Sequence, residues 1–177
     1  MWNNLRKKYA SILKSEEAGL NFDSEWMEFK EIALSIEKNP PPAVSSIQNS
    51  LNQIEKYKDR KNIKIFDHGC GAGLKIIYLA TIGYTSVYGV NVNFDVNFIN
   101  KILKKKFNIK ENHFFITKGK TVPFKNKFFD FIISSQVVEH LTEDEIIIYY
   151  SEEGRVLKKN GYAYHEVPHK FMPYESH

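Results

Sequence analysis

The sequence is poor in the features that mark secreted, metal-clustered or membrane-spanning proteins. A single cysteine among 177 residues leaves no partner for an intrachain disulfide and no basis for a cysteine-ligated metal cluster. No apolar run approaches the roughly 20 residues that a membrane-spanning helix requires. The N-terminus, M-W-N-N-L-R-K-K, continues into polar residues and predicts no signal peptide. We therefore expect a cytoplasmic protein in a reducing compartment, with no membrane span.

The composition is that of an ordinary globular chain with a mild positive charge. Hydrophobic residues make up 42% and charged residues 26%, and thirteen Phe, ten Tyr and two Trp provide material for a core. The net charge of +4 permits an anionic partner without requiring one. Lysines are concentrated between residues 101 and 127, which is typical of a solvated face. No nucleic-acid-binding module is recognisable, so we do not expect a nucleic-acid partner.

The first sixty residues predict helices. Apolar residues recur at steps of three and four from Phe22 to Ile36 and again from Val44 to Tyr57, and each series forms one face of a helix. Asp23 or Ser24 is expected to cap the first of these helices. The three prolines at 40–42 end it, because proline cannot continue a helix. This part of the chain is therefore expected to form a helical extension.

From residue 63 onward, short apolar strands alternate with amphipathic helices. Strands are predicted at 63–66, 86–92, 114–117, 129–134 and 162–167, and helices at 74–82, 94–106 and 142–157. Gly83 is placed to stop the first helix, T-E-D-E at 142–145 has the form of a capping box, and N-G at 160–161 predicts a turn. The alternation predicts a doubly wound α/β fold, with a mainly parallel sheet and helices on both faces.

The sharpest local signal is the glycine-rich segment D-H-G-C-G-A-G at 67–73, between a strand and a helix. Glycines allow a tight turn and let a ligand approach the main chain, while the N–H groups of the following helix favour a carboxylate or phosphate. A dinucleotide fingerprint would need a glycine at position 74, which is Leu74. A P-loop would need Lys-Ser or Lys-Thr after the last glycine. The spacing therefore disfavours an NAD-type oxidoreductase and excludes a P-loop.

The segment I-F-D-H-G-C-G-A-G resembles motif I of class I S-adenosylmethionine (SAM)-dependent methyltransferases. The likeness continues in register with V-P-F at 122–124, F-D-F-I-I-S-S-Q-V-V-E-H at 129–140 and R-V-L-K-K-N-G at 155–161. It implies that residues 61–177 form the Rossmann-like, SAM-binding core and that residues 1–60 form a lid over the site. Since the chain ends shortly after the fifth strand, where this family adds a C-terminal hairpin, we expect a truncated core. Its exposed sheet edge would permit a homodimer.

The resemblance assigns the cofactor to the carboxyl ends of the first strands. It places the glycine loop against the methionine part of SAM, with Asp67 holding the loop and Cys70 as a small packed side chain. Asn91 stands where the family has an acidic residue for the ribose, and Lys120 stands where it often has an aspartate for the adenine. Both departures lower the expected affinity for SAM. The cofactor-binding residues that the resemblance implies are Asp67, Gly69, Cys70, Gly71, Gly73, Asn91, Val92, Lys120, Thr121, Ser135 and Gln136.

The pair Glu139-His140, after the fourth strand, is the candidate for acid–base chemistry. Transfer of a methyl group to an oxygen of high pKa requires removal of its proton, and histidine suits this role near neutral pH. Alternatively, His140 caps or packs against the following helix. A metal site that joins His140, His165 and Glu166 is not expected, because alternation along a strand sends His165 and Glu166 to opposite faces.

Together these features predict a SAM-dependent methyltransferase that acts on a small molecule or a sugar. One alternative is a non-catalytic scaffold or partner subunit that has the same fold and weakened cofactor binding, which Asn91 and Lys120 favour. The other is an NAD-type oxidoreductase, which the glycine spacing disfavours.

Overall fold

The computed structural model describes residues 1–92, 95–117 and 121–167 of the chain. Five parallel strands form a single sheet in the order β3-β2-β1-β4-β5. Their bounds are β1 (Ile65–His68), β2 (Val87–Asn91), β3 (Phe114–Ile116), β4 (Phe129–Ser135) and β5 (Leu157–Glu166). The strand order reverses between β1 and β4, and ligands bind beyond the carboxyl ends of the strands at such a reversal. The doubly wound α/β fold is confirmed.

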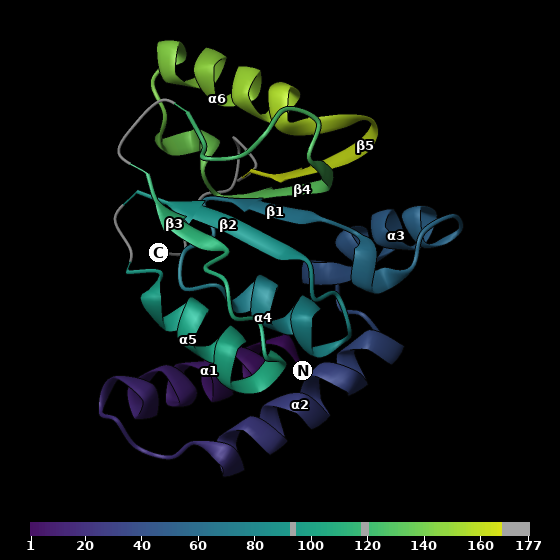
Figure 1. Ribbon diagram of the computed structural model, residues 1–177. Coiled ribbons are helices and arrows are strands. Elements are labelled where there is room, and N and C mark those ends of the chain that lie inside the picture. Colours follow the sequence, from purple (N-terminus) through teal and green to yellow (C-terminus); the bar gives the residue numbers. More distant parts are fainter. Residues whose placement is uncertain (93–94, 118–120, 168–177) are drawn as a thin grey trace, which may run out of the picture.

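Helices cover both faces of the sheet (Figure 1). Their bounds are α1 (Trp2–Glu17), α2 (Asp23–Lys38), α3 (Pro42–Glu55), α4 (Leu74–Thr81), α5 (Asn97–Phe107) and α6 (Glu143–Val156), with two 3-10 turns, η1 (Arg60–Asn62) and η2 (Val138–His140). Helix α6 lies on one face, above the sheet in Figure 1, and α3, α4 and α5 lie on the other. Helices α1 and α2 form a second layer beneath α4 and α5. Among the described residues, no helix combines the length and apolar character needed to cross a bilayer.

The N-terminal helices share one apolar core with the sheet. Leu5, Ile12 and Phe29 are fully buried and belong to the same cluster as Ile65 of β1 and Ile77 of α4. Burial of each large apolar side chain contributes roughly 1.5–3 kcal/mol. Helices α1 to α3 are therefore packed as layers of the same body as the sheet.

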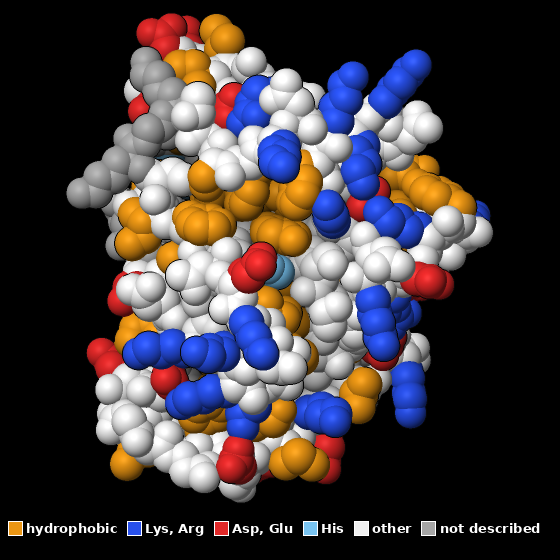
Figure 2. Space-filling model, in the orientation of Figure 1, with side chains coloured by type: hydrophobic (Ala, Val, Ile, Leu, Met, Phe, Trp, Pro, Cys, Tyr) orange, Lys and Arg blue, Asp and Glu red, His pale blue; other side chains and the backbone are white. Residues whose placement is uncertain are grey.

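The face beneath α6 carries a smaller and more polar core. Phe66, Phe124 and Phe129 pack around one another, with ring centroids 4.9–5.2 Å apart. The side chain of Glu153, from α6, is buried on this face and contacts His68, whose ring stacks on Phe66. Part of this face reaches the surface, where Figure 2 shows hydrophobic side chains bordered by Lys and Arg side chains. The two faces of the sheet are thus covered in different ways.

The turn predicted before the last strand is wrong. Strand β5 begins at Leu157, so the N-G pair at 160–161 lies inside the strand. The pairing of β4 with β5 is irregular at this point, and a Cβ on Gly161 would lie 3.0 Å from the main-chain oxygen of Asp130. A Cβ would also lie 2.6 Å from Cδ1 of Leu157, since β5 bulges between Leu157 and Tyr162, so glycine fits both the bulge and the close approach of β4.

Of the two helix N-caps predicted from the sequence, the one for α2 is wrong and the one for α6 is confirmed. Neither Asp23 nor Ser24 caps α2; instead, Asn21 Oδ1 accepts the Asp23 N–H at 2.7 Å just before the helix. The capping box of α6 is confirmed. Glu145 Oε2 accepts the Thr142 N–H at 2.9 Å, and Thr142 Oγ1 accepts the Glu145 N–H at 3.4 Å.

Candidate functional site

The glycine loop follows β1 at the carboxyl edge of the sheet. Gly69, Gly71 and Gly73 have positive φ angles of +94°, +50° and +82°. A Cβ on Gly69 would collide with Val137, and one on Gly73 would lie 2.7 Å from Ile99, so these two glycines allow the loop to pack closely. A Cβ on Gly71 would meet no described atom within 4 Å. Gly71 is therefore the point where bare main chain borders open space.

Hydrogen bonds hold the loop in this shape. The main-chain N–H groups of Gly69 and Cys70 both donate to Val90 O, at 3.1 and 3.0 Å, and join the loop to β2. Tyr9, from α1, donates its hydroxyl proton to Ala72 O at 2.6 Å. Because burial raises the pKa of Tyr9, the hydroxyl keeps its proton and stays a donor. Helix α1 thus supports the glycine loop directly.

Two titratable groups of the loop region are desolvated. Asp67, the third residue of β1, is 4% exposed, and burial raises its pKa to about 7 against the opposing charge of Lys75. A carboxyl in this state takes up a proton or a neighbouring cation near neutral pH. Burial, and then the charge of Asp67, raise the pKa of the Cys70 thiol. Cys70 is therefore a protonated, packed side chain and not a nucleophile.

The position expected to bind the ribose lies at the end of β2. The Asn91 side-chain Oδ1 accepts the N–H of Val92 at 2.8 Å, so the amide oxygen is already engaged within the strand end. Val92 is 58% exposed, and Thr121 is also exposed. Lys120 lies outside the described residues. The amide oxygen that would replace the family's acidic acceptor therefore already has one partner.

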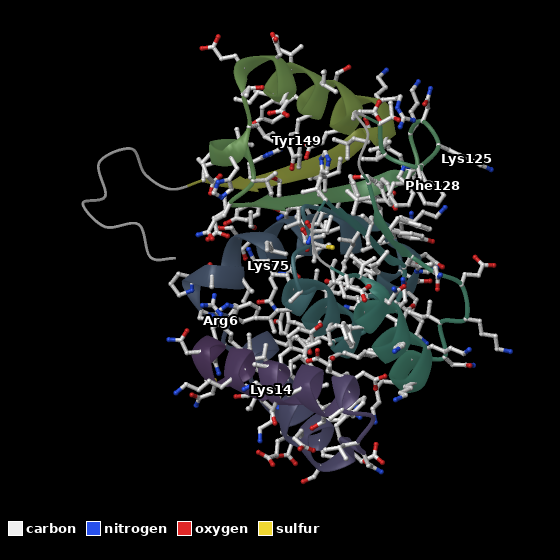
Figure 3. The ribbon with its side chains drawn as sticks, turned by 90° about the vertical axis from the view of Figure 1, so that its left-hand side faces the viewer. Arg6, Lys14, Lys75, Lys125, Phe128 and Tyr149 are labelled. Atoms are coloured by element: carbon white, nitrogen blue, oxygen red, sulfur yellow. The ribbon has the colours of Figure 1, made fainter. Side chains whose placement is uncertain are left out.

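A cluster that the sequence analysis did not identify joins α4 to the ends of two strands. Lys75 Nζ, in the first turn of α4, donates to Ser135 Oγ at the end of β4 and forms an ion pair with Glu166 Oε2 at 2.8 Å. The Lys75 side chain is labelled in Figure 3. A lysine just after a glycine loop, on the first turn of a helix that faces the strand ends, is the signal that could have identified it.

The segment after β4 holds the predicted acid–base residues. Gln136 has a φ of +54°, a left-handed conformation that costs a non-glycine residue about 1 kcal/mol and is enriched at functional sites. Its N–H donates to Glu166 O at 2.8 Å. Glu139 and His140 follow on η2 and are exposed. Thr142, and not His140, is the N-cap residue of α6.

Buried polar side chains support the strand ends from the side of α6. Both oxygens of the Glu153 carboxylate are engaged: Oε1 lies 3.1 Å from His68 Nδ1, and Oε2 lies 3.1 Å from His165 Nε2. The ring of Tyr149 stacks on His68 with centroids 3.8 Å apart and planes at 6°. Its hydroxyl donates to His68 O at 2.9 Å and hydrogen-bonds with Ser134 Oγ at 2.8 Å. Figure 3 shows Tyr149 between α6 and the sheet.

The alternation predicted for β5 is confirmed. His165 contacts Glu153 of α6, whereas Glu166 contacts Lys75 of α4 on the opposite face. Within the part of the chain that the structure describes, no group of three His, Cys, Asp or Glu side chains is placed to hold a metal ion.

The described structure is that of an α/β enzyme domain whose ligand site lies at the carboxyl ends of the strands. Its marks are the parallel sheet, the glycine loop and the polar ends of β4 and β5. A family model described as a methyltransferase domain matches residues 66–165, which is more than half of the chain. The chain therefore belongs to the class I SAM-dependent methyltransferase family, and SAM is the cofactor of this family. The family that the motifs indicated is thus confirmed.

Several named proteins resemble the chain. Ubiquinone biosynthesis O-methyltransferase of Pelagibacter ubique is 33% identical over 104 residues, which cover 59% of this chain and 41% of that protein. The chain thus spans less than half the length of this relative. A solved structure from Pyrococcus horikoshii OT3 has a TM-score of 0.51 at 25% identity, over 72% of this chain and 55% of that one. Geranyl diphosphate C-methyltransferase from Streptomyces coelicolor A3(2) has a TM-score of 0.52 at 17% identity, over 78% and 48%.

Proposed function

We propose that this chain is a SAM-dependent methyltransferase that methylates an oxygen of a small-molecule acceptor, sugars included. The observation that carries the proposal is the open space beside Gly71, at the end of β1, in a chain of the methyltransferase family. The name of the curated relative, a ubiquinone biosynthesis O-methyltransferase, supports a small molecule as the acceptor and oxygen as the methylated atom.

The loop residues fit the methionine part of the cofactor. Bare main chain at Gly71 and the positive end of α4 suit a carboxylate. Asp67 suits an ammonium group, because a desolvated carboxyl becomes charged when a cation neutralises it. The residues proposed for the cofactor are Asp67, Gly69, Cys70, Gly71, Gly73, Asn91, Val92, Thr121, Ser135 and Gln136, with Lys120 outside the described residues.

SAM supplies an electrophilic methyl group, and the chain supplies alignment and proton removal. As the new bond from the acceptor oxygen to the methyl carbon forms, the bond from sulfur to that carbon breaks, and the acceptor loses its proton to a base. His140, exposed on η2 after β4, is the proposed base. The Lys75 ammonium group, held by Ser135 and Glu166, is proposed to stabilise the oxyanion that develops.

Alanine at two glycines tests where the cofactor binds, because Gly71 and Gly19 both have a positive φ and a Cβ meets no described atom within 4 Å at either position. Gly71→Ala adds a methyl group to the proposed cradle, and Gly19→Ala adds one, with the same kind of backbone strain, between α1 and α2. In calorimetric titrations with SAM and S-adenosylhomocysteine, we expect Gly71→Ala to weaken binding about tenfold or more. Gly19→Ala should leave the affinity unchanged. Equal affinities for Gly71→Ala and the unaltered chain would reject the cradle.

The acceptor is identified by a second measurement. Transfer of a tritiated methyl group from SAM to a panel of phenols and sugars should occur with the unaltered chain and fall by about two orders of magnitude in His140→Ala. A His140→Ala variant that retains the full rate would reject His140 as the base.

A non-catalytic subunit with weak cofactor binding is the second candidate function. It is favoured by Asn91, whose side-chain oxygen is already used by the Val92 N–H. Asn91→Asp restores the acidic acceptor and should tighten SAM binding about tenfold if this side chain meets the ribose. An unaltered chain that binds no SAM and methylates no acceptor would support the second candidate over the first.

The remaining parts of the proposal concern the surroundings of the site. Residues 1–60 are proposed as the helical extension and residues 61–177 as the SAM-binding core, with Tyr9 of α1 linking the two at Ala72. The outer edge of β5, which pairs with no strand among the described residues, is proposed to permit a homodimer, since such an edge can pair with another copy. One buried cysteine, Cys70, suits a cytoplasmic location.

A further inference from the structure

A group of lysines lies at the amino-terminal edge of the sheet, opposite the glycine loop. Lys64 directly precedes β1, Lys158 is the second residue of β5, and Lys58 and Lys125 lie in the segments before β1 and β4. Lys58 Nζ and Lys158 Nζ lie 2.6 and 2.7 Å from the two carboxylate oxygens of Asp130. The main-chain N–H of Lys64 donates to the same carboxylate at 2.9 Å. We call Lys58, Lys64, Lys125 and Lys158 the lysine cluster.

The lysine cluster carries more positive charge than the carboxylate within it balances. Burial opposes the charged form of Asp130, yet the ammonium groups of Lys158 and Lys58 lower the pKa of this carboxyl. The pKa of Lys64 is lowered by burial and by the charges of Lys158, Lys58 and Lys125. Asp130 offsets this repulsion only in part. Additional negative charge at this edge would therefore be stabilised.

We propose that the lysine cluster is a docking surface for an acidic segment of a partner polypeptide. The four ammonium groups come from three segments of the chain, and the side chains of Lys58 and Lys158 are 24% and 36% exposed. A ligand that carries several carboxylates along a chain matches this spread of charge better than a single anion does. Complementary charge of this kind speeds association and selects the partner.

The aromatic side chains beside the lysine cluster favour a polypeptide over single-stranded nucleic acid. Single strands bind by stacking their bases on open aromatic faces. The Lys64 ammonium group lies 3.7 Å from the centroid of the Phe128 ring and covers one of its faces. Phe124 lies parallel to Phe128 at 6.4 Å, and Phe129 meets it edge-on at 5.0 Å. The ring of Phe128 is therefore occupied by its own neighbours, which favours recognition by charge over stacking of bases.

The docking surface lies apart from the methyltransferase site. Strand β4 begins near Asp130 and ends at Ser135, so these residues are separated by about 16 Å along the strand. Figure 3 shows Lys125 and Phe128 together at the right of the view, away from Lys75. Figure 2 shows Lys and Arg side chains gathered around the hydrophobic side chains toward the upper right. A partner bound here would leave the glycine loop accessible.

The test uses a fluorescent oligo-glutamate peptide, whose binding to the whole chain is followed by anisotropy at low salt. Lys64→Gln/Lys125→Gln removes two charges from the lysine cluster and leaves both ion pairs of Asp130 in place. Lys101→Gln/Lys104→Gln removes two exposed charges from α5 and is the matched control. We expect the cluster variant to weaken binding about tenfold and the control to change it less than about twofold. Binding should also fall as salt is raised.

Four results would overturn the proposal. The unaltered chain could show no binding at low salt, or the control variant could lose as much affinity as the cluster variant, which would indicate an effect of net charge alone. Tighter binding of an oligothymidylate with the same number of charges would indicate a nucleic-acid surface. Competition by inorganic phosphate beyond that of chloride at equal ionic strength would indicate a site for a single anion. Circular dichroism verifies that both variants are folded, and SAM affinity should be the same in all three proteins.

Discussion

The two faces of the sheet are attached to their helices by different kinds of contact. On the face toward α4, apolar side chains such as Ile65 and Ile133 belong to a cluster that continues through α4 and α5 into α1 and α2. On the face toward α6, Phe66 lies beside the imidazole of His68. Helix α6 contacts this face through the carboxylate of Glu153, which meets the His68 ring, and through the hydroxyl of Tyr149, which donates to His68 O.

This difference assigns separate tasks to the two faces. Apolar contacts are non-directional and scale with the buried area, so the α4 face supplies most of the free energy of unfolding. Hydrogen bonds are directional, so the α6 face sets the positions of the ends of β1, β4 and β5. These ends carry the glycine loop, Ser135 and Glu166. Substitutions toward α4 should therefore change stability most, and substitutions toward α6 should change activity at a smaller cost in stability.

The largest effect is expected from Phe29 in the second helical layer. Its ring is fully buried and lies 5.4 Å from the ring of Trp26 and 5.9 Å from that of Tyr9. Phe29→Ala should lower the free energy of unfolding by about 4 kcal/mol, measured by urea denaturation. Met27→Ala, on the same helix but 54% exposed, should change it by less than about 0.5 kcal/mol. If Phe29→Ala lowered the free energy of unfolding no more than Met27→Ala does, the second helical layer would contribute little to the stability of the fold.

Substitution of Asp67 is expected to give the next largest change in stability, and this change should be a gain. The pKa of Asp67 rises from 3.8 to about 7 on folding, so the folded chain holds a proton that the unfolded chain releases between these values. The contribution of Asp67 to stability is therefore greatest below pH 4 and falls as the pH rises to 7. At pH 8, Asp67→Asn should be more stable by on the order of 3 kcal/mol and should bind SAM more weakly.

Thermal melts of the Asp67→Asn variant and the unaltered chain from pH 3 to pH 8 measure this difference. The two stabilities should converge toward the acid end, where the carboxyl is protonated in both the folded and the unfolded state. A variant that is less stable than the unaltered chain at pH 8 would show that the charged carboxylate strengthens the loop.

On the α6 face, Glu153 is expected to matter less than Phe29 for stability. Glu153→Ala leaves His68 and His165 without their shared partner and should cost about 2 kcal/mol. Ser151→Ala, at an exposed position of the same helix, should cost less than about 0.5 kcal/mol. If Glu153→Ala matched its control, the polar contacts would not hold α6 to the sheet.

Local patterns predicted most of the elements because their physical causes are local. The strands at 86–92 and 129–134 and the capping box that starts at Thr142 follow from neighbours within a few residues. Turn preference at 160–161 is also local, but these residues lie in a bulge of β5, between Leu157 and Tyr162, which both pair with β4. Helix α1 was not delimited, because its buried residues, such as Leu5 and Ile12, are separated by charged ones that blur the pattern.

The polar clusters of the site could not be predicted, because they join residues far apart in the sequence. Alternation correctly sends His165 and Glu166 to opposite faces, but it does not indicate which partner each one meets. His68 and Glu153 are brought together only once α6 is docked on the sheet. Lys75 likewise reaches the ends of β4 and β5 only through the packing of α4. Motifs within one segment are thus more predictable than contacts between segments.

The smallest effect on stability among the substituted site and core residues is expected from Tyr149. Its substitution best separates the contribution of the sheet faces to stability from their contribution to positioning the strand ends. Tyr149→Phe keeps the stacking on His68 and removes the hydroxyl contacts, among them those with His68 O and Ser134 Oγ, so it should cost about 1 kcal/mol. Tyr150→Phe, whose side chain is 44% exposed, is the matched control. Because the lost hydroxyl holds the ends of β1 and β4 together, Tyr149→Phe should slow methyl transfer about tenfold while the control does not. An activity loss no larger than that of the control would mean that α6 supports the fold without positioning the site.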